Sequence, residues 1–415
     1  MRLLPFLFVI YVIAFLDRVN FGYAALEMNS ALGINAEIFG LLSGIFFLGY
    51  LIFEIPSNII LQRIGARIWI TRIMISWGIV VIITAAATTS LQMGVLRFVL
   101  GIAEAGFFPG VILYLTFWFP RKELAKAVAI FMAALTVANI IGAPVSTWIL
   151  DNIHWFGIEG WRWLFILEGL PAVIFGVITW LYLTDRPGDA QWLEPEEKAW
   201  LTAQLDREKE NSRINGGHRD FRSIFKDIRI WHLGGIYCML TIGLYGLGFW
   251  MPQIIRTLNA NFSNFEIGLV MILPYAAGCI AMILWSRHSD TTGERRWHTA
   301  IPPLAGGIGL LGSGLVADPI AAYLLLILAT VGIYSTFGSF WTLPALFLTG
   351  ISAAVGIATI NSIGNLGGFI GPSLMGLLTQ VTGSMNAGLI AIGACLIFSG
   401  LLAIAIREKN AGRST

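Results

Sequence analysis

Four of the ionisable residues inside apolar stretches of the first half of the sequence form two pairs. Asp17 and Arg18 are neighbours near the middle of the apolar run from Leu3 to Ala25. Arg97 and Glu104 lie in a later apolar run and are seven residues apart, which puts them on one face of a helix. A charge in the middle of a bilayer costs about 2.5–3.5 kcal/mol on insertion scales, so the charges that proteins keep there usually serve a function.

These residue types could bind both a proton and an anion. Carboxyl groups that face each other in a low-dielectric site take up protons more readily, whereas a neighbouring arginine favours the charged form. We therefore expect Asp17 and Glu104 to bind and release protons. We expect Arg97 and Arg18 to bind an anion, because a guanidinium group can hold a carboxylate through a planar pair of hydrogen bonds. The alternatives are a purely structural salt-bridge network, and an Arg18 that only holds its neighbour in place.

Polar residues recur along the apolar segment 40–62. They are Ser43, Tyr50, Glu54, Ser57 and Asn58. Their spacing puts them on one face of a helix. Tyr50 lies deeper in the segment, so we expect it to contact a substrate. Glu54 and Asn58 lie near its end, where we expect gating residues or packing contacts. A further carboxyl, Glu168, falls inside the apolar run 161–184.

The second half offers neutral hydrogen-bonding groups in place of charges. Its last four apolar runs contain no Asp, Glu, Lys or Arg before Arg407. A hydroxylated substrate would need polar partners, because its hydroxyl groups lose water on entering a buried site. The candidates are Tyr245, Gln253, Trp341, Asn361 and Asn365. The alternative for each of them is a hydrogen bond between two helices.

The composition is that of an integral membrane protein. Of the 415 residues, 57% are hydrophobic and 12% are charged, against about 25% charged in a soluble domain. The mean hydropathy is +0.77. The apolar runs are about 20 residues long, which fits spanning helices better than the strands of a barrel. The net charge of +2 argues against a nucleic-acid partner. The three cysteines lack the spacing of a disulfide framework or a metal site, and we expect no cofactor.

We predict an all-α membrane protein with twelve spanning helices in two bundles of six. The expected spans are roughly 3–25, 40–62, 67–88, 91–119, 124–150, 161–184, 229–257, 265–288, 299–317, 319–348, 350–378 and 385–406. The N-terminal bundle covers 1–184, a cytoplasmic linker covers 185–228, and the C-terminal bundle with a short cytoplasmic tail covers 229–415. The linker segment LEPEEKAWLTAQLDREKE predicts a surface helix.

The two halves look duplicated. RIGARIW follows the second span and TTGERRW follows the eighth, while GAP in the fifth span and IGP in the eleventh lie the same distance apart. An even number of spans in each unit gives a parallel repeat, which places a binding site near the membrane midplane between the halves.

Lysine and arginine gather in alternate loops. Arg63 and Arg67 lie between the second and third spans, and Arg295 lies between the eighth and ninth. Because such cations favour the cytoplasmic side, we expect both termini and the linker in the cytoplasm, in a bacterial inner membrane. Arg63, Arg67, Asp290 and Arg295 are expected to take part in gating. The five histidines lie in loops or at span ends, which argues against a buried histidine relay.

Several segments resemble a known family. RIGAR and DTTGERR are similar to the loop signature of the major facilitator superfamily and to its copy in the second half. The segments that resemble the anion:cation symporter family within it are FLDRVNFGYAALEMN, FEIPSN, RFVLGIAEAGFFPG, EGWRWLFILEGLPA and LTDRPGDAQWL. The motifs occur in order and cover nearly the whole chain. Members that this chain resembles include proton-coupled permeases for tartrate, galactonate, glucarate, rhamnonate and aromatic acids such as 4-hydroxyphenylacetate.

The resemblance implies roles for individual residues. Asp17 and Glu104 match the family's proton-binding carboxylates, and Arg97 matches the arginine that couples protonation to the anion. Arg18 matches the neighbour of the first carboxylate. The positions at which sugar-acid members contact their substrate fall on Tyr50, Trp341 and Asn361.

Two departures from the family pattern stand out. Gln62 replaces the aspartate of the loop signature, which puts a gating salt bridge at that position in doubt. The segment FMAALTVANIIGAP lacks the glutamine with which sugar-acid members hold their substrate, which weakens a sugar-acid assignment in particular.

The sequence predicts a monomeric, proton-coupled symporter that imports a small organic anion by alternating access. The expected substrate is a hydroxy acid or sugar acid such as tartrate, rhamnonate or galactonate, or an aromatic carboxylate. The alternatives are a proton-coupled exporter or exchanger and a transporter-like sensor that moves no substrate. We expect no enzyme, because we find no nucleophile–base set and no metal-ligand spacing.

Overall fold

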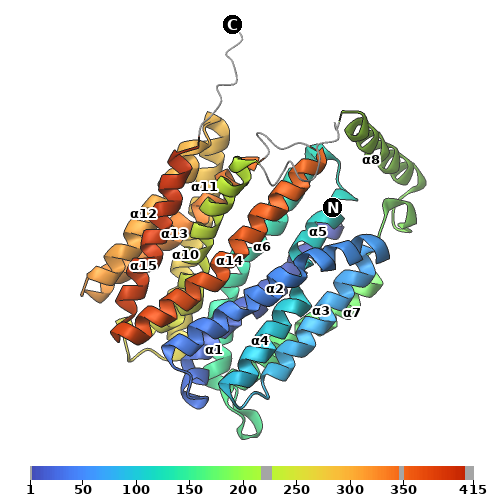
Figure 1. Cartoon of the computed structure of the whole chain (residues 1–415). Helices are drawn as coiled ribbons and strands as arrows, with labels where there is room; N and C mark the ends of the chain where they lie inside the picture. The colour runs from blue at the N-terminus through green and yellow to red at the C-terminus, as the bar shows by residue number, and fades with distance from the viewer. Residues whose placement is uncertain (1, 216–226, 345–349, 407–415) are drawn as a thin grey trace. The chain divides into compact units, whose positions relative to one another are not determined.

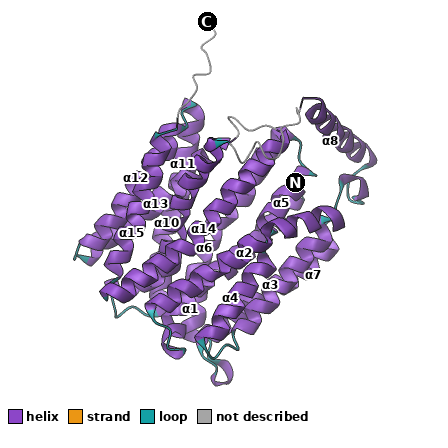
Figure 2. Cartoon of the chain, viewed as in Figure 1, coloured by secondary structure: helices purple, strands orange, loops and turns teal. Residues whose placement is uncertain are grey.

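The regular elements of the residues that the structure describes are helices. The structure is a computed structural model, and it describes residues 2–215, 227–344 and 350–406 (Figure 1). Within these ranges no strand occurs (Figure 2). Ten helical segments in the described ranges are long and apolar enough to cross a membrane, which agrees with the prediction of an all-α membrane protein.

Seven α-helices build the N-terminal half. They are α1 (Leu3–Ala31), α2 (Ala36–Ile64), α3 (Ala66–Thr84), α4 (Ser90–Glu104), α5 (Phe107–Thr116), α6 (Arg121–Asn152) and α7 (Gly160–Tyr182). Side chains cap the starts of two of them: Asn35 accepts from the backbone N–H of Ile38 at 2.8 Å, and Thr89 accepts from that of Gln92 at 3.2 Å. Such caps satisfy backbone donors that a helix start leaves open.

The fourth predicted span, 91–119, is broken into α4 and α5. Gly106 separates the two helices with a φ of +85°, a left-handed conformation that favours glycine. A Cβ at Gly106 would lie 2.3 Å from the Ser57 hydroxyl oxygen. That hydroxyl donates to the backbone oxygen of Ala105 at 2.6 Å. The break makes Glu104 the last residue of α4.

Seven further α-helices follow within the described residues. They are α8 (Pro195–Asn215), α10 (Ile228–Leu258), α11 (Asn264–Thr292), α12 (Arg296–Leu315), α13 (Pro319–Phe340), α14 (Gly350–Thr382) and α15 (Met385–Ile404). Two short 3₁₀ turns, Trp155–Gly157 and Pro187–Asp189, flank α7. The surface helix expected in the linker is α8. The predicted span 319–348 is helical only to Phe340, and 345–349 lie outside the described residues.

The chain divides into two compact units. Unit 1 comprises Met1–Arg219, Met251–Arg256 and Ala260–Ile272, and unit 2 comprises Asp220–Trp250, Thr257–Asn259 and Leu273–Thr415. In unit 1, α3 packs on α7, α1 on α6 and α2 on α4. In unit 2, α12 packs on both α13 and α15. The bundle boundaries expected at 184 and 229 stay a prediction.

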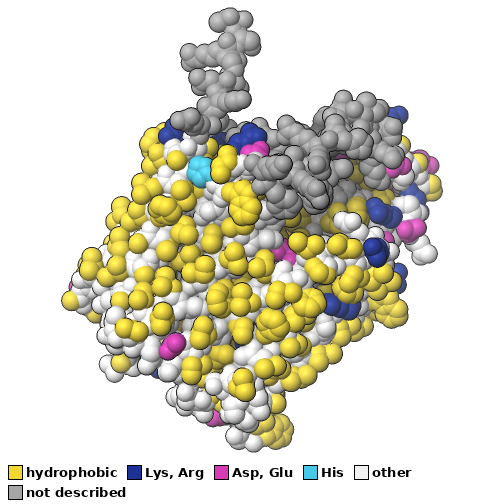
Figure 3. All heavy atoms as spheres, viewed as in Figure 1, with side chains coloured by type: hydrophobic (Ala, Val, Ile, Leu, Met, Phe, Trp, Pro, Cys, Tyr) yellow, Lys and Arg dark blue, Asp and Glu magenta, His cyan; other side chains and the backbone are white. Residues whose placement is uncertain are grey.

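Large apolar side chains cover the outer faces of the helices. Ile55 on α2 is 62% exposed, Ile308 on α12 is 58% exposed and Phe398 on α15 is 51% exposed. Hydrophobic side chains dominate the face of the molecule in Figure 3. Because a helix satisfies its backbone hydrogen bonds internally, such an apolar exterior suits the hydrocarbon of a bilayer.

Candidate functional site

A buried ion pair joins α1 to the end of α4. The Arg18 Nη2 atom donates to the Glu104 Oε1 atom, and the two side chains are 11% and 2% exposed. The Arg18 guanidinium also lies 5.3 Å from the ring centre of Phe46 and 5.4 Å from that of Tyr50. Arg18 is therefore held by a carboxylate from α4 and by two aromatic rings from α2, of which Tyr50 is a predicted substrate contact.

Arg97 is fixed beside this pair by its contacts with α1 and α2. Its side chain is buried, and its Nε atom donates to the backbone oxygen of Leu42 at 3.4 Å. Its guanidinium lies 4.4 Å from the ring centre of Phe21 and 5.2 Å from that of Phe46. Glu104 interacts electrostatically with both Arg18 and Arg97. The structure thus brings together three of the four ionisable residues predicted to form the site.

Asp17, the fourth of these residues, points to a different neighbour. The Trp77 Nε1 atom on α3 donates to the Asp17 Oδ2 atom at 2.8 Å. Successive residues of an α-helix are about 100° apart around its axis, so Asp17 faces α3 while Arg18 faces α2 and α4. Asp17 also interacts electrostatically with Glu104, and the expected part of both carboxyls in one proton-binding network stays a prediction.

Three polar residues near Asp17 were not assigned to the site from the sequence. Glu168 on α7 accepts a hydrogen bond from the Ser146 hydroxyl of α6 at 2.5 Å, at its Oε1 atom. Asn20, one turn after Asp17 on α1, interacts with the same carboxyl. The charge of Glu168 inside an apolar run was visible in the sequence. The hydroxyl and amide partners carried no signal, because such residues are common in helix interiors.

The polar stripe of α2 includes two predicted gating residues. Glu54 is buried, and the Asn58 Nδ2 atom donates to the backbone oxygen of Glu54 at 2.8 Å. Asn58 thus bonds to its own helix. Arg67, another predicted gating residue, lies at the start of α3. The side chain of Asp185, which follows α7, accepts from the backbone N–H of Arg67 at 2.9 Å. Arg63 is exposed near the end of α2.

The predicted substrate contacts of the second half lie on α10, on α14 and just after α13. Trp341, just after α13, packs its ring 5.0 Å from that of Tyr237 and 5.2 Å from that of Phe340. Tyr245 on α10 lies 6.3 Å from Phe249, ring centre to ring centre.

The remaining three predicted contacts are amides. Asn361 and Asn365 are half-buried, one turn apart on α14. Gln253 belongs to unit 1, where its Oε1 atom accepts from the Asn29 Nδ2 atom at 3.5 Å. The part of all five residues in substrate binding stays a prediction.

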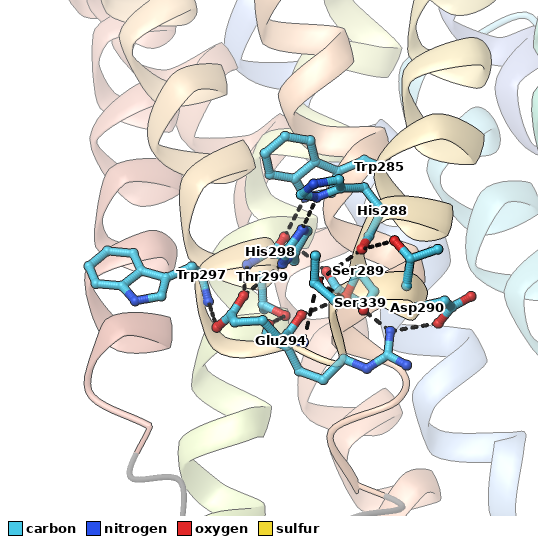
Figure 4. Close-up of polar contacts among 12 residues, drawn as sticks. Trp285, His288, Ser289, Asp290, Glu294, Trp297, His298, Thr299 and Ser339 are labelled. Carbon is cyan, nitrogen blue, oxygen red and sulfur yellow. Dashed lines mark hydrogen bonds and ion pairs between the residues drawn. The ribbon is translucent and has the colours of Figure 1, made fainter.

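Two predicted gating residues, Asp290 in the last turn of α11 and Arg295 just before α12, pair with each other. The Arg295 Nη1 atom lies 2.7 Å from the Asp290 Oδ1 atom and donates to the Ser289 hydroxyl at 3.0 Å. Ser289 in turn donates to the backbone oxygen of Glu294 at 2.8 Å. Figure 4 shows Asp290, Ser289 and Glu294 gathered at this turn. The contacts close the loop between α11 and α12.

Two histidines meet at the same turn. The His288 Nδ1 atom lies 2.7 Å from the His298 Nε2 atom, and the His298 Nδ1 atom lies 2.7 Å from the Glu294 Oε2 atom (Figure 4). Burial raises the pKa of Glu294, but hydrogen bonds from the backbone N–H of Trp297, from the His298 side chain and from its backbone outweigh burial and hold that pKa below its usual value. The histidines lie at helix ends, as the sequence indicated.

Comparisons with known proteins agree with this architecture. Residues 7–372 match the family described as the Major Facilitator Superfamily. A protein of Agrobacterium vitis named "Putative tartrate transporter" is 44% identical over 416 residues, which cover 100% of this chain and 95% of the relative. A protein of Acinetobacter baumannii named "Quinolone resistance transporter" is 36% identical over 408 residues, which cover 98% of this chain and 94% of the relative.

Solved structures share the fold. A bacterial homologue of the human lysosomal transporter Spinster, in an inward-facing and occupied conformation, superposes with a TM-score of 0.78 at 18% identity, over 97% of this chain and 96% of that one. The relatives that cover nearly the whole chain are named as transporters, not as enzymes. The chain therefore belongs to the major facilitator superfamily of multi-pass membrane transporters.

Proposed function

We propose that this transporter is a proton-coupled symporter that imports a small organic anion. The buried ion pair of Arg18 with Glu104 carries the proposal. While the Arg18 guanidinium is paired with an ionised Glu104, it is not available to a substrate carboxylate. The Glu104 carboxylate and the substrate carboxylate therefore compete for Arg18. A proton on Glu104 ends the competition and releases Arg18 to the substrate. Proton and anion then favour each other's binding, and this reciprocal coupling is what symport requires.

Arg97 makes the site attractive to an anion once Glu104 is neutral. Its guanidinium is buried against Phe21 and Phe46. A buried cation is costly unless an anion compensates it. With Glu104 protonated, Arg18 and Arg97 would both be compensated by the substrate. Two guanidinium groups that share the ring of Phe46 suit a substrate with two carboxylates, or with one carboxylate and neighbouring hydroxyl groups.

A hydroxy acid such as tartrate fits these groups best. The relative that is 44% identical bears the name of a tartrate transporter. The ring of Tyr50 beside Arg18 brings a hydroxyl-bearing side chain to the carboxylate site. We assign Tyr245, Gln253, Trp341, Asn361 and Asn365 to the substrate hydroxyl groups. Glu54, Asn58, Arg63, Arg67, Asp290 and Arg295 are assigned to gating, in a monomer of the bacterial inner membrane with both termini in the cytoplasm.

The proposal is tested by uptake of labelled tartrate into proteoliposomes. An acidic exterior should drive accumulation above the external concentration, and a protonophore should abolish it. The Glu104→Gln variant cannot release a proton, so it should exchange substrate across the membrane without accumulating it. The matched control is Glu37→Gln, which makes the same chemical change at an exposed residue in the first turn of α2. Accumulation by Glu104→Gln at the wild-type level would contradict the assignment.

Export is the second candidate function. The relative named as a quinolone resistance transporter favours it. Proton-driven export would show as proton-dependent uptake of a quinolone into inside-out vesicles, without competition by tartrate. The symport proposal expects no such uptake, because the buried arginines suit an anion.

A further inference from the structure

Two histidine rings and one carboxylate form a hydrogen-bonded chain at the turn between α11 and α12 (Figure 4). The His288 Nδ1 atom lies 2.7 Å from the His298 Nε2 atom, and the His298 Nδ1 atom lies 2.7 Å from the Glu294 Oε2 atom. The side chains of His298 and Glu294 are 8% and 31% exposed, whereas His288 is exposed. The chain therefore connects the solvent to a buried ring, and the proposed transport cycle gives it no part.

The carboxylate determines where the hydrogens of this chain lie. Hydrogen bonds from the backbone and from His298 hold the pKa of Glu294 below its usual value, so at neutral pH Glu294 is ionised and only accepts. The His298 Nδ1 atom must then carry a hydrogen, and in the neutral ring its Nε2 atom is an acceptor. His288 must therefore donate from its Nδ1 atom. A first proton can bind to the Nε2 atom of His288 without breaking either contact.

A second proton cannot bind without breaking one contact. When both rings are protonated, each of the two nitrogens that face each other carries a hydrogen, and both are donors. Two like charges at this distance also repel each other. His298 keeps its ionised partner Glu294, so the exposed ring of His288 is the one that must turn away. Histidine changes its charge between about pH 5 and 8, so a mildly acidic solution is enough to cause this change.

The same chain fastens three helices to one another. His288 belongs to α11 and His298 to α12. The backbone oxygen of His298 accepts from the Trp285 Nε1 atom of α11 at 2.8 Å and from the Ser339 hydroxyl of α13 at 2.9 Å. The usual partner of this oxygen would be the N–H of the residue one helical turn later, but that residue is Pro302, which has no N–H. Contacts from α11 and α13 therefore meet at His298.

The predicted gating pair belongs to the same turn. Arg295 contacts Asp290 and donates to the Ser289 hydroxyl, which donates to the backbone oxygen of Glu294. Glu294 thus connects the histidine chain to the gating pair. The helices α13 and α15, which pack on α12, contain no Asp, Glu, Lys, Arg or His. The charged side chains that surround the two histidines in the sequence are Arg287, Asp290, Glu294, Arg295 and Arg296.

We propose that His288, His298 and Glu294 form a regulatory proton site, which holds α11 and α12 together with one added proton or none and releases them when both histidines are protonated. Protonation of histidine clusters alters interfaces in other pH sensors in this way. The regulatory proton is distinct from the one proposed to move with the substrate at Glu104. Its role in regulation rests on the proposed proton import: in the proposed orientation the site faces the cytoplasm, so cytoplasmic acidification slows the import of further protons.

NMR spectroscopy of the full-length protein in detergent, with isotope-labelled histidine, tests the site without any substrate. A hydrogen shared by two ring nitrogens gives a measurable coupling between them. The coupling between the His288 Nδ1 and His298 Nε2 atoms should be present at about pH 7.5 and absent at about pH 5. His288→Gln should lack it at both, which assigns the signal. A coupling that is absent at the higher pH, or unchanged at the lower one, would overturn the proposal.

Tartrate exchange in proteoliposomes with the same pH on both sides tests the regulation, because no proton gradient then acts. The amide of His288→Gln can donate to a neutral His298 and accept from a protonated one, so this variant should keep the contact at either pH. Its rate relative to the wild type should be near unity at about pH 7.5 and rise about fivefold or more at about pH 5. The control His154→Gln changes an exposed histidine beside the turn Trp155–Gly157 and should follow the wild type.

The outcomes separate this inference from the proposed function. A relative rate of His288→Gln that does not depend on pH would refute the regulation. A wild-type protein that does not exchange tartrate would contradict the proposed function, and the NMR coupling would still decide whether the two histidines separate at low pH.

Discussion

Replacing Gly101 by alanine tests whether the close approach of α2 and α4 positions the two arginines. A Cβ at Gly101 would lie 2.0 Å from the backbone oxygen of Phe46 and 2.9 Å from the backbone nitrogen of Tyr50. Real Cβ contacts are longer than 3.0 Å. The clashing atoms belong to the backbone and cannot rotate away, so α4 must move from α2 by about 1 Å to relieve the overlap.

The displacement should affect both stability and transport. Overpacking of this kind costs about 1–3 kcal/mol, which should lower the unfolding temperature in detergent. The same shift moves Glu104 relative to Arg18, and a misplacement of about 1 Å at a functional site can reduce a rate by about 100-fold. We therefore expect the loss of proton-driven uptake to exceed what the lost stability explains.

Gly248→Ala is the matched control. Gly248 lies in α10, and in the described structure a Cβ there would meet no atom within 4 Å. Alanine favours a helix over glycine by about 0.5–1 kcal/mol, so this variant should unfold at the same or a slightly higher temperature and transport normally. Thermal unfolding and tartrate uptake are measured on both variants. Wild-type stability and uptake in Gly101→Ala would refute the reasoning about the α2–α4 contact.

Three further predictions concern single contacts. Arg18→Lys should raise the KM for tartrate at least tenfold in uptake assays, because an ammonium group cannot hold a carboxylate through a planar pair of hydrogen bonds; an unchanged KM would place Arg18 outside the substrate site. Trp77→Phe removes the donor to Asp17 and should cost about 1–3 kcal/mol of stability, measured by thermal unfolding; an unfolding temperature equal to the wild type would contradict the importance of this bond. The pKa of Glu294 is lowered in the folded protein. Its ionised form therefore stabilises the fold at pH values above its ordinary pKa of 4.5, and this stabilisation is lost as the pH falls through the lowered pKa. Melting curves should therefore show Glu294→Gln less stable than the wild type at pH 6, with the difference shrinking below about pH 4.5; a difference independent of pH would contradict this.

Hydropathy predicted the helical segments well because each apolar run is long enough to cross a bilayer. It failed inside 91–119, where the run stays apolar through the break at Gly106. A glycine in an apolar run is compatible with a continuous helix. At the break, the Ser57 hydroxyl of α2 donates to the backbone oxygen of Ala105 and leaves no room for a Cβ at Gly106, and that contact is a tertiary one.

The residues of the site were easier to predict than their partners. Asp17, Arg18, Arg97 and Glu104 stood out because charge is rare in an apolar run. Sequence spacing tells which residues share a face of one helix, but it does not tell which neighbouring helix that face meets. Trp77 was missed for this reason, since a tryptophan in an apolar span looks like any other hydrophobic residue until its indole is found on Asp17.

The most direct test of the central claim counts the protons taken up when the substrate binds. If tartrate replaces Glu104 as the partner of Arg18, the carboxylate of Glu104 should bind a proton from solution. In weakly buffered detergent with a pH indicator, the wild-type protein should take up about one proton for each tartrate bound, and Glu104→Gln should take up none. Tartrate binding to the wild type without proton uptake, at a pH where Glu104 is ionised, would contradict the account.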